Sequence, residues 1–306
     1  MACGYRILTL KKICMNILKT IGLPALLIAS FSSCKKSGSD DTTGPSVNFI
    51  FKFDSTQVRL NALGQPVSVA AGNGAQSPVF NLMSAHYLEM TADQFTALGA
   101  GAVLYRAPET TAGGANAIDF SKSAFAGEGQ TFLSVPIKSF AAGTYNWLRV
   151  SLAYQNYNIK FRSSGLDLTG TLASFIGFRT YLQNYKVKDS TIQVNANKDQ
   201  GYWAFETSVS GFGFVSSGQA PPGATTVPNP LFATSPIPAG SCVVTGQFAS
   251  PLVITGSETS DITIVVSLST NKSFEWSEVS GPGTFDPSNG DQVVDMGIRG
   301  MIPFKL

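Results

Sequence analysis

The stretch that decides the fold is residues 261–268, DITIVVSL. Its apolar side chains Ile262, Ile264, Val266 and Leu268 fall on every second position. Alternation with a period of two residues is typical of a β-strand that buries one face. Residues 47–54, VNFIFKFD, repeat this pattern with phenylalanines on one face. Both segments therefore predict strands of a half-buried sheet.

A longer apolar run opens at Gly143. Its apolar side chains lie at even positions from Leu148 to Tyr154 and at odd positions from Tyr157 to Phe161. Because side chains alternate between the faces of a strand, this change of parity predicts a β-bulge or tight turn near Gln155-Asn156. Three further runs, each bounded by Gly, Asn or Asp, also predict strands: residues 172–182, 186–195 and 202–214.

Helical patterns are few, and one segment is rich in proline. Residues 91–98 predict two helical turns capped by Thr91. Residues 216–240 contain six prolines, which cannot donate to a sheet ladder, so they predict a long packed surface loop. With 30 glycines and 11% aromatic residues, the composition suits many strands joined by turns. We therefore expect an all-β fold, an antiparallel β-sandwich with a long Pro-rich loop and at most one or two short helices.

The first 33 residues differ in kind from the rest of the chain. They contain Lys11, Lys12 and Lys19 but no acidic residue, and an apolar run over residues 21–29 leads to Ser32-Ser33-Cys34. Such an order of charge, apolar run and small residues is typical of a secretory signal. The apolar run is shorter than the roughly 20 residues that span a bilayer. Met15 provides an alternative start with a compact positively charged segment behind it.

The segment before Cys34 resembles the bacterial lipobox, although Phe31 stands where that motif usually has Leu. The resemblance implies cleavage before Cys34, lipidation there, and localisation to the cell envelope, on either face of the outer membrane. An ordinary cleavage site beside an unlipidated Cys is the alternative. Polar residues 34–46 predict a flexible tether, and their acidic run resembles the surface-export signals of Bacteroidota lipoproteins. The expected order is signal peptide 1–33, tether 34–46 and β-sandwich domain 47–306.

Removal of the leader changes the charge of the protein. Residues 1–33 hold four of the basic side chains, so 17 basic and 19 acidic side chains remain in the 273 mature residues. This near-neutral chain lacks the basic surplus of a nucleic-acid-binding protein. It also lacks a basic membrane-binding patch, so the lipid on Cys34 is the expected membrane contact. A chain of this length can build one large β domain or two smaller ones.

Residues for catalysis and metal binding are scarce. The chain has one histidine, His86, and the mature domain has one thiol besides Cys34, Cys242, so no internal disulfide can form. No metal-binding spacing is present, and a Ser-His-Asp triad would have to use His86. The acidic turn over residues 286–295 lacks the register of a calcium-binding loop. We therefore expect no enzyme activity, no metal and no cofactor.

Two groups of residues remain as candidate sites. Tyr154, Tyr157 and Trp203 are candidates for glycan binding, because sugars stack on flat aromatic faces beside amide groups. The alternative is that these three rings are ordinary strand residues of the core or rim. Glu206 and Glu275 lie among aromatic residues and could serve as the paired carboxylates of a glycoside hydrolase.

Taken with the leader, these features predict a lipid-anchored cell-envelope protein with a non-catalytic binding or structural role. Its expected partners are the membrane, through the lipid, and a glycan, a partner protein or another cell. In outline the chain resembles fimbrillin-type adhesins and accessory glycan-binding lipoproteins. The alternative is a carboxylate-dependent glycoside hydrolase that uses Glu206 and Glu275. An assembly role would show as an apolar patch or an unpaired edge strand.

Overall fold

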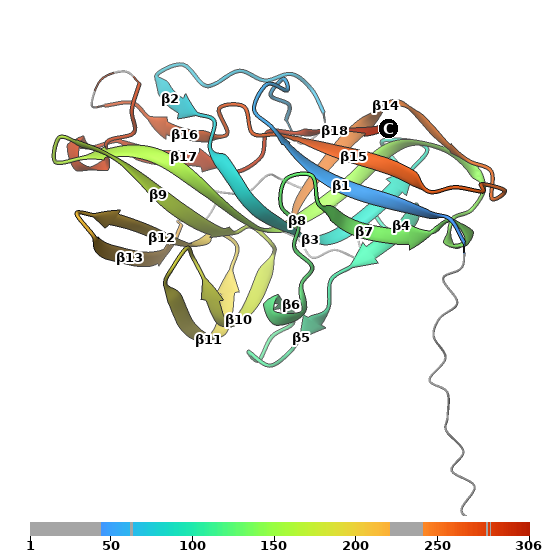
Figure 1. Cartoon of the computed structure of the whole chain (residues 1–306), viewed down its shortest axis with the longest axis horizontal. Coiled ribbons are helices and arrows are strands. Elements are labelled where there is room, and N and C mark those ends of the chain that lie inside the picture. The colour runs from blue at the N-terminus through green and yellow to red at the C-terminus, as the bar shows by residue number, and fades with distance from the viewer. Residues whose placement is uncertain (1–43, 62–63, 221–240, 280, 282) are drawn as a thin grey trace, which may run out of the picture. The chain divides into compact units, whose positions relative to one another are not determined.

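The structure, a computed structural model, describes residues 44–61, 64–220, 241–279, 281 and 283–306 (Figure 1). Strands dominate these residues, and the helical segments among them are the short 3-10 turns η1 (Phe120–Lys122), η2 (Ile137–Ser139) and η4 (Pro287–Asn289). The all-β prediction is therefore confirmed. Among the described residues, no helix is long and apolar enough to cross a bilayer.

The largest sheet has seven strands. Its order is β13 (Phe212–Gln219), β12 (Tyr202–Val209), β9 (Leu166–Phe175), β8 (Gly143–Ser163), β3 (Val79–Thr91) and β4 (Ala102–Arg106). The seventh strand, β14 (Cys242–Ile254), pairs with the first half of β8, whereas β9 pairs with the second half. The 21-residue β8 therefore joins every part of this sheet.

The described residues also form three smaller sheets. The first has the order β18 (Met301–Lys305), β15 (Ile262–Ser269), β1 (Ser46–Asp54) and β7 (Thr131–Pro136). The second has the order β11 (Thr191–Asp199), β10 (Arg179–Lys186), β6 (Ala117–Asp119) and β5 (Glu109–Thr110). The third has the order β17 (Gln292–Met296), β16 (Phe274–Ser277) and β2 (Asn73–Gln76).

Antiparallel pairing holds throughout the described strands with two exceptions. β1 runs parallel to β15, with Val47 opposite Ile262, and β6 runs parallel to β10. Parallel neighbours need a long connection, and here almost the whole domain separates β1 from β15. The alternation of side chains shows which face of a strand is buried but not which strand lies beside it. The parallel pairs were therefore not predicted.

The main core lies between the seven-stranded sheet and the sheet that contains β1. Phe49 and Phe51 of β1 and Ile264 and Val266 of β15 are fully buried there, as the period of two predicts. A second apolar cluster covers the opposite face of β8 and β9 beneath β10 and β11. β8 is therefore buried on both faces, and every residue from Leu148 to Tyr157 is buried.

The predicted bulge in β8 is present, just before the predicted position. Ser84 of β3 pairs with Tyr154 while the next residue, Ala85, pairs with Leu152, so Ala153 is the extra residue. The Ala153 carbonyl accepts two backbone N–H groups from the β9–β10 connection, at 2.9 and 3.0 Å. This bulge explains why apolar residues of the main core change from even to odd positions.

Residues 91–98 do not form the predicted helix, since β3 continues to Thr91 and a turn follows. The Asp93 side chain accepts the N–H of Phe95 at 2.7 Å, which favours a turn over a helix. The Phe95 ring is 74% exposed, so it supplies no core contact that would hold a helix in place.

Other boundaries also differ from the sequence predictions. The run 172–182 is divided between β9 and β10, and the run 202–214 folds as the β12–β13 hairpin around Ser210 and Gly211, both with positive φ. Residues 216–219 of the predicted Pro-rich loop belong to β13, while 221–240 lie outside the described residues. The predicted signal peptide, Cys34 and most of the tether also lie outside them.

Candidate functional site

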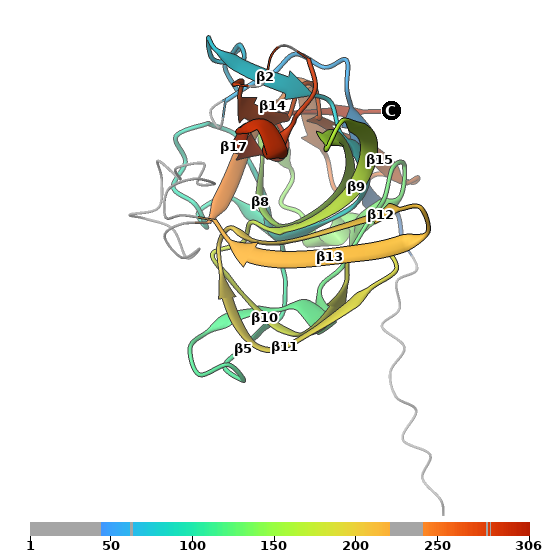
Figure 2. The same ribbon diagram turned by 90° about the vertical axis from the view of Figure 1, so that its left-hand side faces the viewer.

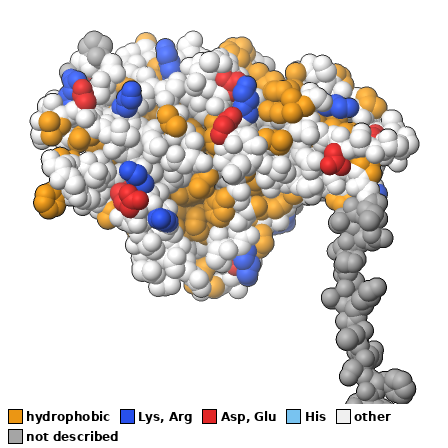
Figure 3. Space-filling model, viewed as in Figure 1, with side chains coloured by type: hydrophobic (Ala, Val, Ile, Leu, Met, Phe, Trp, Pro, Cys, Tyr) orange, Lys and Arg blue, Asp and Glu red, His pale blue; other side chains and the backbone are white. Residues whose placement is uncertain are grey.

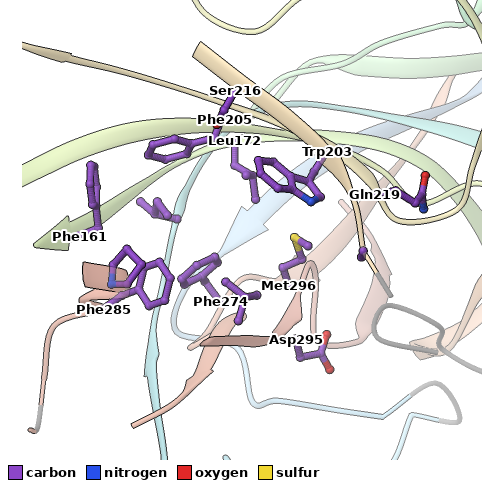
Figure 4. A pocket seen from close by; sticks show the side chains of 14 residues that line it. Phe161, Leu172, Trp203, Phe205, Ser216, Gln219, Phe274, Phe285, Asp295 and Met296 are labelled. Atoms are coloured by element: carbon purple, nitrogen blue, oxygen red, sulfur yellow. The ribbon is translucent and has the colours of Figure 1, made fainter. Parts of the chain in front are cut away.

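An aromatic cavity of about 540 Å³ lies between the β12–β13 hairpin and the β16–β17 hairpin. Its lining residues come from β8, β9, β12, β13, β16, β17 and the η4 region, and most of them are apolar. Figure 4 shows two facing walls, with Leu172, Trp203 and Phe205 on one side and Phe274, Phe285 and Met296 on the other. The cavity therefore has the shape of a slot between two apolar layers.

Glycines on the neighbouring strands position the rings of the first wall. Trp203 is paired directly with Gly218 of β13, and a Cβ atom at Gly218 would lie only 2.9 Å from the indole ring. The Phe205 ring lies closer still over Gly170 of β9. A ring that covers a glycine on the next strand lies along the sheet instead of standing away from it. The faces of Trp203 and Phe205 are therefore available to the cavity.

The second wall contains buried aromatic side chains. Phe274 and Phe285 meet edge to face, with ring centroids 5.2 Å apart. Trp276, on the same strand as Phe274, is 0% exposed and lies over Gly74 of β2. Phe161 packs edge-on against Phe205 at 5.2 Å and narrows one end of the slot.

Polar groups are few in the cavity. Among the described lining residues Asp295 is the one that is charged, and its carboxylate is paired with the guanidinium of Arg299. Figure 4 shows Asp295 at the end of the cavity opposite Phe161. Gln219 also lines the cavity, but its side-chain amide donates to the carbonyl of Gln200 at 2.7 Å. Charged side chains are likewise sparse and scattered on the molecular face shown in Figure 3.

Of the three aromatic residues predicted for ligand binding, only Trp203 lines the cavity. Tyr157 is fully buried in the main core, stacked on Phe80 at 4.8 Å. Tyr154 is 3% exposed and packs on the other side of the sheet against Phe175, where burial raises its pKa to about 12. The bulge at Ala153 precedes both tyrosines, and the pairing of β8 with β9 is regular between them. Their spacing of three residues therefore places them on opposite faces, and the predicted three-residue aromatic face is not formed.

Glu206 and Glu275 face away from the cavity. Each directly follows a lining residue, Phe205 or Phe274, and successive side chains of a strand point to opposite faces. The structure therefore does not place the two carboxylates across this cavity, as the predicted hydrolase pair would require.

The two carboxylates instead hold loops in place. Glu206 accepts the backbone N–H groups of Lys188, Asp189 and Ser190 at 2.9 to 3.2 Å. Burial raises the pKa of Glu206, but these donors outweigh burial and leave it below its usual value. A general acid of a glycosidase needs the opposite shift.

Glu275 forms a buried ion pair with Arg59 at 2.8 Å and accepts the Asn73 amide at 2.7 Å. Burial raises the pKa of Glu275. Its hydrogen bonds and the charge of Arg59 lower the pKa by more, so that it lies below its usual value. Both carboxylates are therefore held in their ionised form by structural partners.

His86 and Cys242 are buried within strands. His86 is 1% exposed, its Nε2 lies 2.8 Å from the carboxylate of Glu109, and burial lowers its pKa. Burial raises the pKa of the Cys242 thiol to about 12. Over the described part of the chain, no three His, Cys, Asp or Glu side chains lie close enough to hold a metal ion.

The other aromatic residues of the cavity were not predicted from the sequence. The alternation of side chains in the sequence does indicate that Trp203 and Phe205 lie on one face of β12. The facing residues Phe274 and Phe285 lie some distance along the chain, and only the arrangement of the sheets brings them opposite β12. Comparison of the chain with protein-family models, curated proteins and solved structures gave no match.

Proposed function

We propose that the mature chain is a lipid-anchored binding protein of the cell envelope and that the aromatic cavity is its ligand site. The ligand we propose is an uncharged, flat apolar group that lies between Trp203 and Phe205 on one wall and Phe274 on the other. The observation that carries this proposal is the slot itself, an apolar cavity whose wall rings are positioned over glycines.

The size and chemistry of the cavity support this ligand class. A volume of about 540 Å³ is within the range of small-molecule sites. Apolar ligand surface that leaves water there contributes roughly 25 cal/mol per Å². A charged ligand would lose its hydration without gaining a free counter-charge, because Asp295 is already paired with Arg299.

A polysaccharide is a poorer fit to the same cavity. Sugar hydroxyls need several hydrogen-bond partners when they leave water. The described lining offers the side chains of Ser216, Gln219 and Asp295 and the indole N–H of Trp203. Of these, Gln219 donates to the Gln200 carbonyl and Asp295 is paired with Arg299. The apolar ligand is therefore favoured over the glycan, although both would stack on the same rings.

The envelope location rests on the leader. The lipobox-like segment that ends at Cys34 predicts lipidation, and the polar residues after it predict a tether. The first described strand begins at Ser46, the last residue of the predicted tether. In this proposal the cavity therefore belongs to a folded domain held close to a membrane by a short polar segment.

The test uses residues 35–306 without the lipid and N-phenyl-1-naphthylamine, an uncharged aromatic probe that becomes fluorescent in apolar sites. We expect saturable binding that weakens about tenfold in Trp203→Ala and in Phe205→Ala, since loss of a stacked ring is worth ~1.5 kcal/mol. The matched control is Trp147→Ala, which removes a half-buried tryptophan of β8 that does not line the cavity.

Circular dichroism would confirm that each variant retains its strands. Absence of saturable binding by the unmodified domain would reject the proposal, as would equal affinity in both cavity variants and the control. A glycan-array signal that disappears in Trp203→Ala but persists in Trp147→Ala would replace the apolar ligand by a sugar.

A further inference from the structure

The strand β13 forms an edge of the seven-stranded sheet. Figure 2 shows it at the near end of the molecule, beside β12. Within the described residues β12 is its only strand partner, so its outer edge has no neighbouring strand there. Phe212, Phe214 and Val215 on this strand are 72%, 57% and 47% exposed.

β13 lacks the features that normally protect an edge. Proteins discourage edge pairing with charges, prolines, bulges or very short strands. The other described strands at sheet edges have one of these features: Arg106 in β4, Glu109 in β5, Lys198 in β11, Asp295 in β17, Lys305 in β18, Pro136 in β7, Pro251 in β14, and the four-residue length of β2. The sequence of β13, FGFVSSGQ, has eight residues with neither charge nor proline.

Large and small side chains are separated along one face of β13. The even positions share the face of Trp203 and Phe205, because Ser216 is paired with Phe205 and Gly218 with Trp203. On that face Phe212 and Phe214 occupy the first half of the strand, and Ser216 and Gly218 occupy the second half.

This order makes the strand complementary to a reversed copy of itself. If two copies of β13 pair antiparallel about a two-fold axis at Val215, Phe214 of one copy lies opposite Ser216 of the other. Phe212 then lies opposite Gly218, so that each large side chain meets a small one. Val215 faces its own equivalent, and no like charges are opposed. Such a self-matching surface is what a two-fold interface requires.

We infer that β13 is the docking surface for a second copy of this chain, which continues the sheet across the two-fold axis. A partner strand with charged side chains would find no counter-charge on β13, whereas β13 itself supplies a matching uncharged strand. Ser216 lines the cavity, so Phe214 of the second copy would extend the aromatic wall of the first. The pairing itself needs no ligand and is independent of the function proposed above.

The first test is cysteine cross-linking of residues 35–306. In Val215→Cys the two thiols would be directly opposed across the axis, where Cα atoms of paired strands lie ~4.5–5.5 Å apart, within disulfide range. We expect a covalent dimer under mild oxidation. Cys242 is buried and will not compete. Val103→Cys, on the opposite edge strand β4 and 48% exposed, is the matched control and is expected to stay monomeric.

The second test is the mass of the unmodified domain by sedimentation velocity over a concentration series. We expect a reversible dimer that is lost in Val215→Lys, which opposes two like charges, and kept in Val103→Lys. An unmodified domain that stays monomeric over the whole concentration series would overturn the inference. A dimer that persists in Val215→Lys would also overturn it. Cross-linking of Val103→Cys as readily as Val215→Cys would do the same. Binding of N-phenyl-1-naphthylamine is measured separately on Val215→Lys. Failure of dimer formation can then be distinguished from failure of the cavity proposal.

Discussion

Replacement of Glu206 by Gln tests whether the carboxylate of Glu206 has a structural or a catalytic role. Glu206 is 6% exposed, and its carboxylate receives three backbone N–H groups and the Ser190 hydroxyl, all from residues 188–190. These donors close the connection between β10 and β11 over the second apolar cluster. We expect Glu206→Gln to destabilise the fold, whereas a variant of a catalytic acid usually keeps or gains stability.

The expected loss of stability follows from the backbone N–H donors that the variant leaves without an acceptor. Hydrogen bonds to a charged acceptor contribute ~1.5–3 kcal/mol each, and a buried donor without a partner costs ~1–3 kcal/mol. The glutamine keeps one acceptor oxygen, but its NH₂ group faces backbone N–H groups and leaves at least one of them unpaired. We therefore expect a loss of about 2–4 kcal/mol in the free energy of unfolding near neutral pH.

The effect should also depend on pH. The pKa of Glu206 in the folded protein lies below its usual value of 4.5, so the ionised form stabilises the fold above that pH. This contribution is lost as the pH falls below 4.5 and the carboxylate takes up a proton. The difference between the unmodified protein and Glu206→Gln should therefore shrink in acid.

Urea unfolding of residues 35–306 at neutral pH and below pH 4.5 measures both effects. Glu258→Gln is the control, since Glu258 also accepts backbone N–H groups of a turn but lies at the surface. We expect the control to change stability much less. Equal stability of Glu206→Gln and the unmodified protein at neutral pH would refute the structural role assigned to this carboxylate.

Three further predictions concern other buried polar groups. Arg59→Met should cost up to ~3–5 kcal/mol in urea unfolding, because it removes the nearer of two cations from the buried Glu275 carboxylate and leaves only Arg299, at 3.8 Å. The double variant Arg59→Met/Glu275→Met should recover much of this loss, and a single variant as stable as the unmodified protein would contradict the prediction. Burial lowers the pKa of His86, so the unfolded chain binds the proton more tightly and stability should fall as the pH drops below 6.5. His86→Gln should remove this pH dependence of stability, and an unchanged pH profile in that variant would contradict the prediction. The buried Cys242 thiol, with its pKa raised to about 12, should react with a disulfide reagent only after unfolding, and rapid labelling of the native domain would show this placement to be wrong.

The fold class was predictable because the period of two survives in strands that are buried on one face. Ile264 and Phe49 fall on the core side as expected, and the change of parity after Leu152 revealed a real bulge. The helix predicted from Thr91 onward failed because a local side-chain hydrogen bond formed a turn and the Phe95 ring found no core to enter.

The candidate site was less predictable than the fold. Trp203 was identified as an aromatic residue of an alternating strand, and it lines the cavity. Tyr154 and Tyr157 were assigned to the same surface, but the bulge lies before both of them, so regular alternation places them on opposite faces. The Glu206 and Glu275 carboxylates are adjacent to aromatic residues in sequence, and strand geometry turns them away from these neighbours. Trp203 and Phe274 line the same cavity only because of the order of the sheets, which no local sequence pattern encodes.

The parallel pairing of β1 with β15 also governs when the domain can fold. Ser46 and Asp261, which meet at one end of this pair, are 215 residues apart in the chain. Contacts between such distant segments slow folding, because the loop between them must close before they form. Phe49 and Phe51 must therefore wait for the C-terminal strands before both edges of β1 are covered. Pulse-labelling hydrogen exchange should find the amides of β1 protected late, in the same phase as those of β15, and until that phase the nascent domain would depend on chaperones to keep its first strand from aggregating.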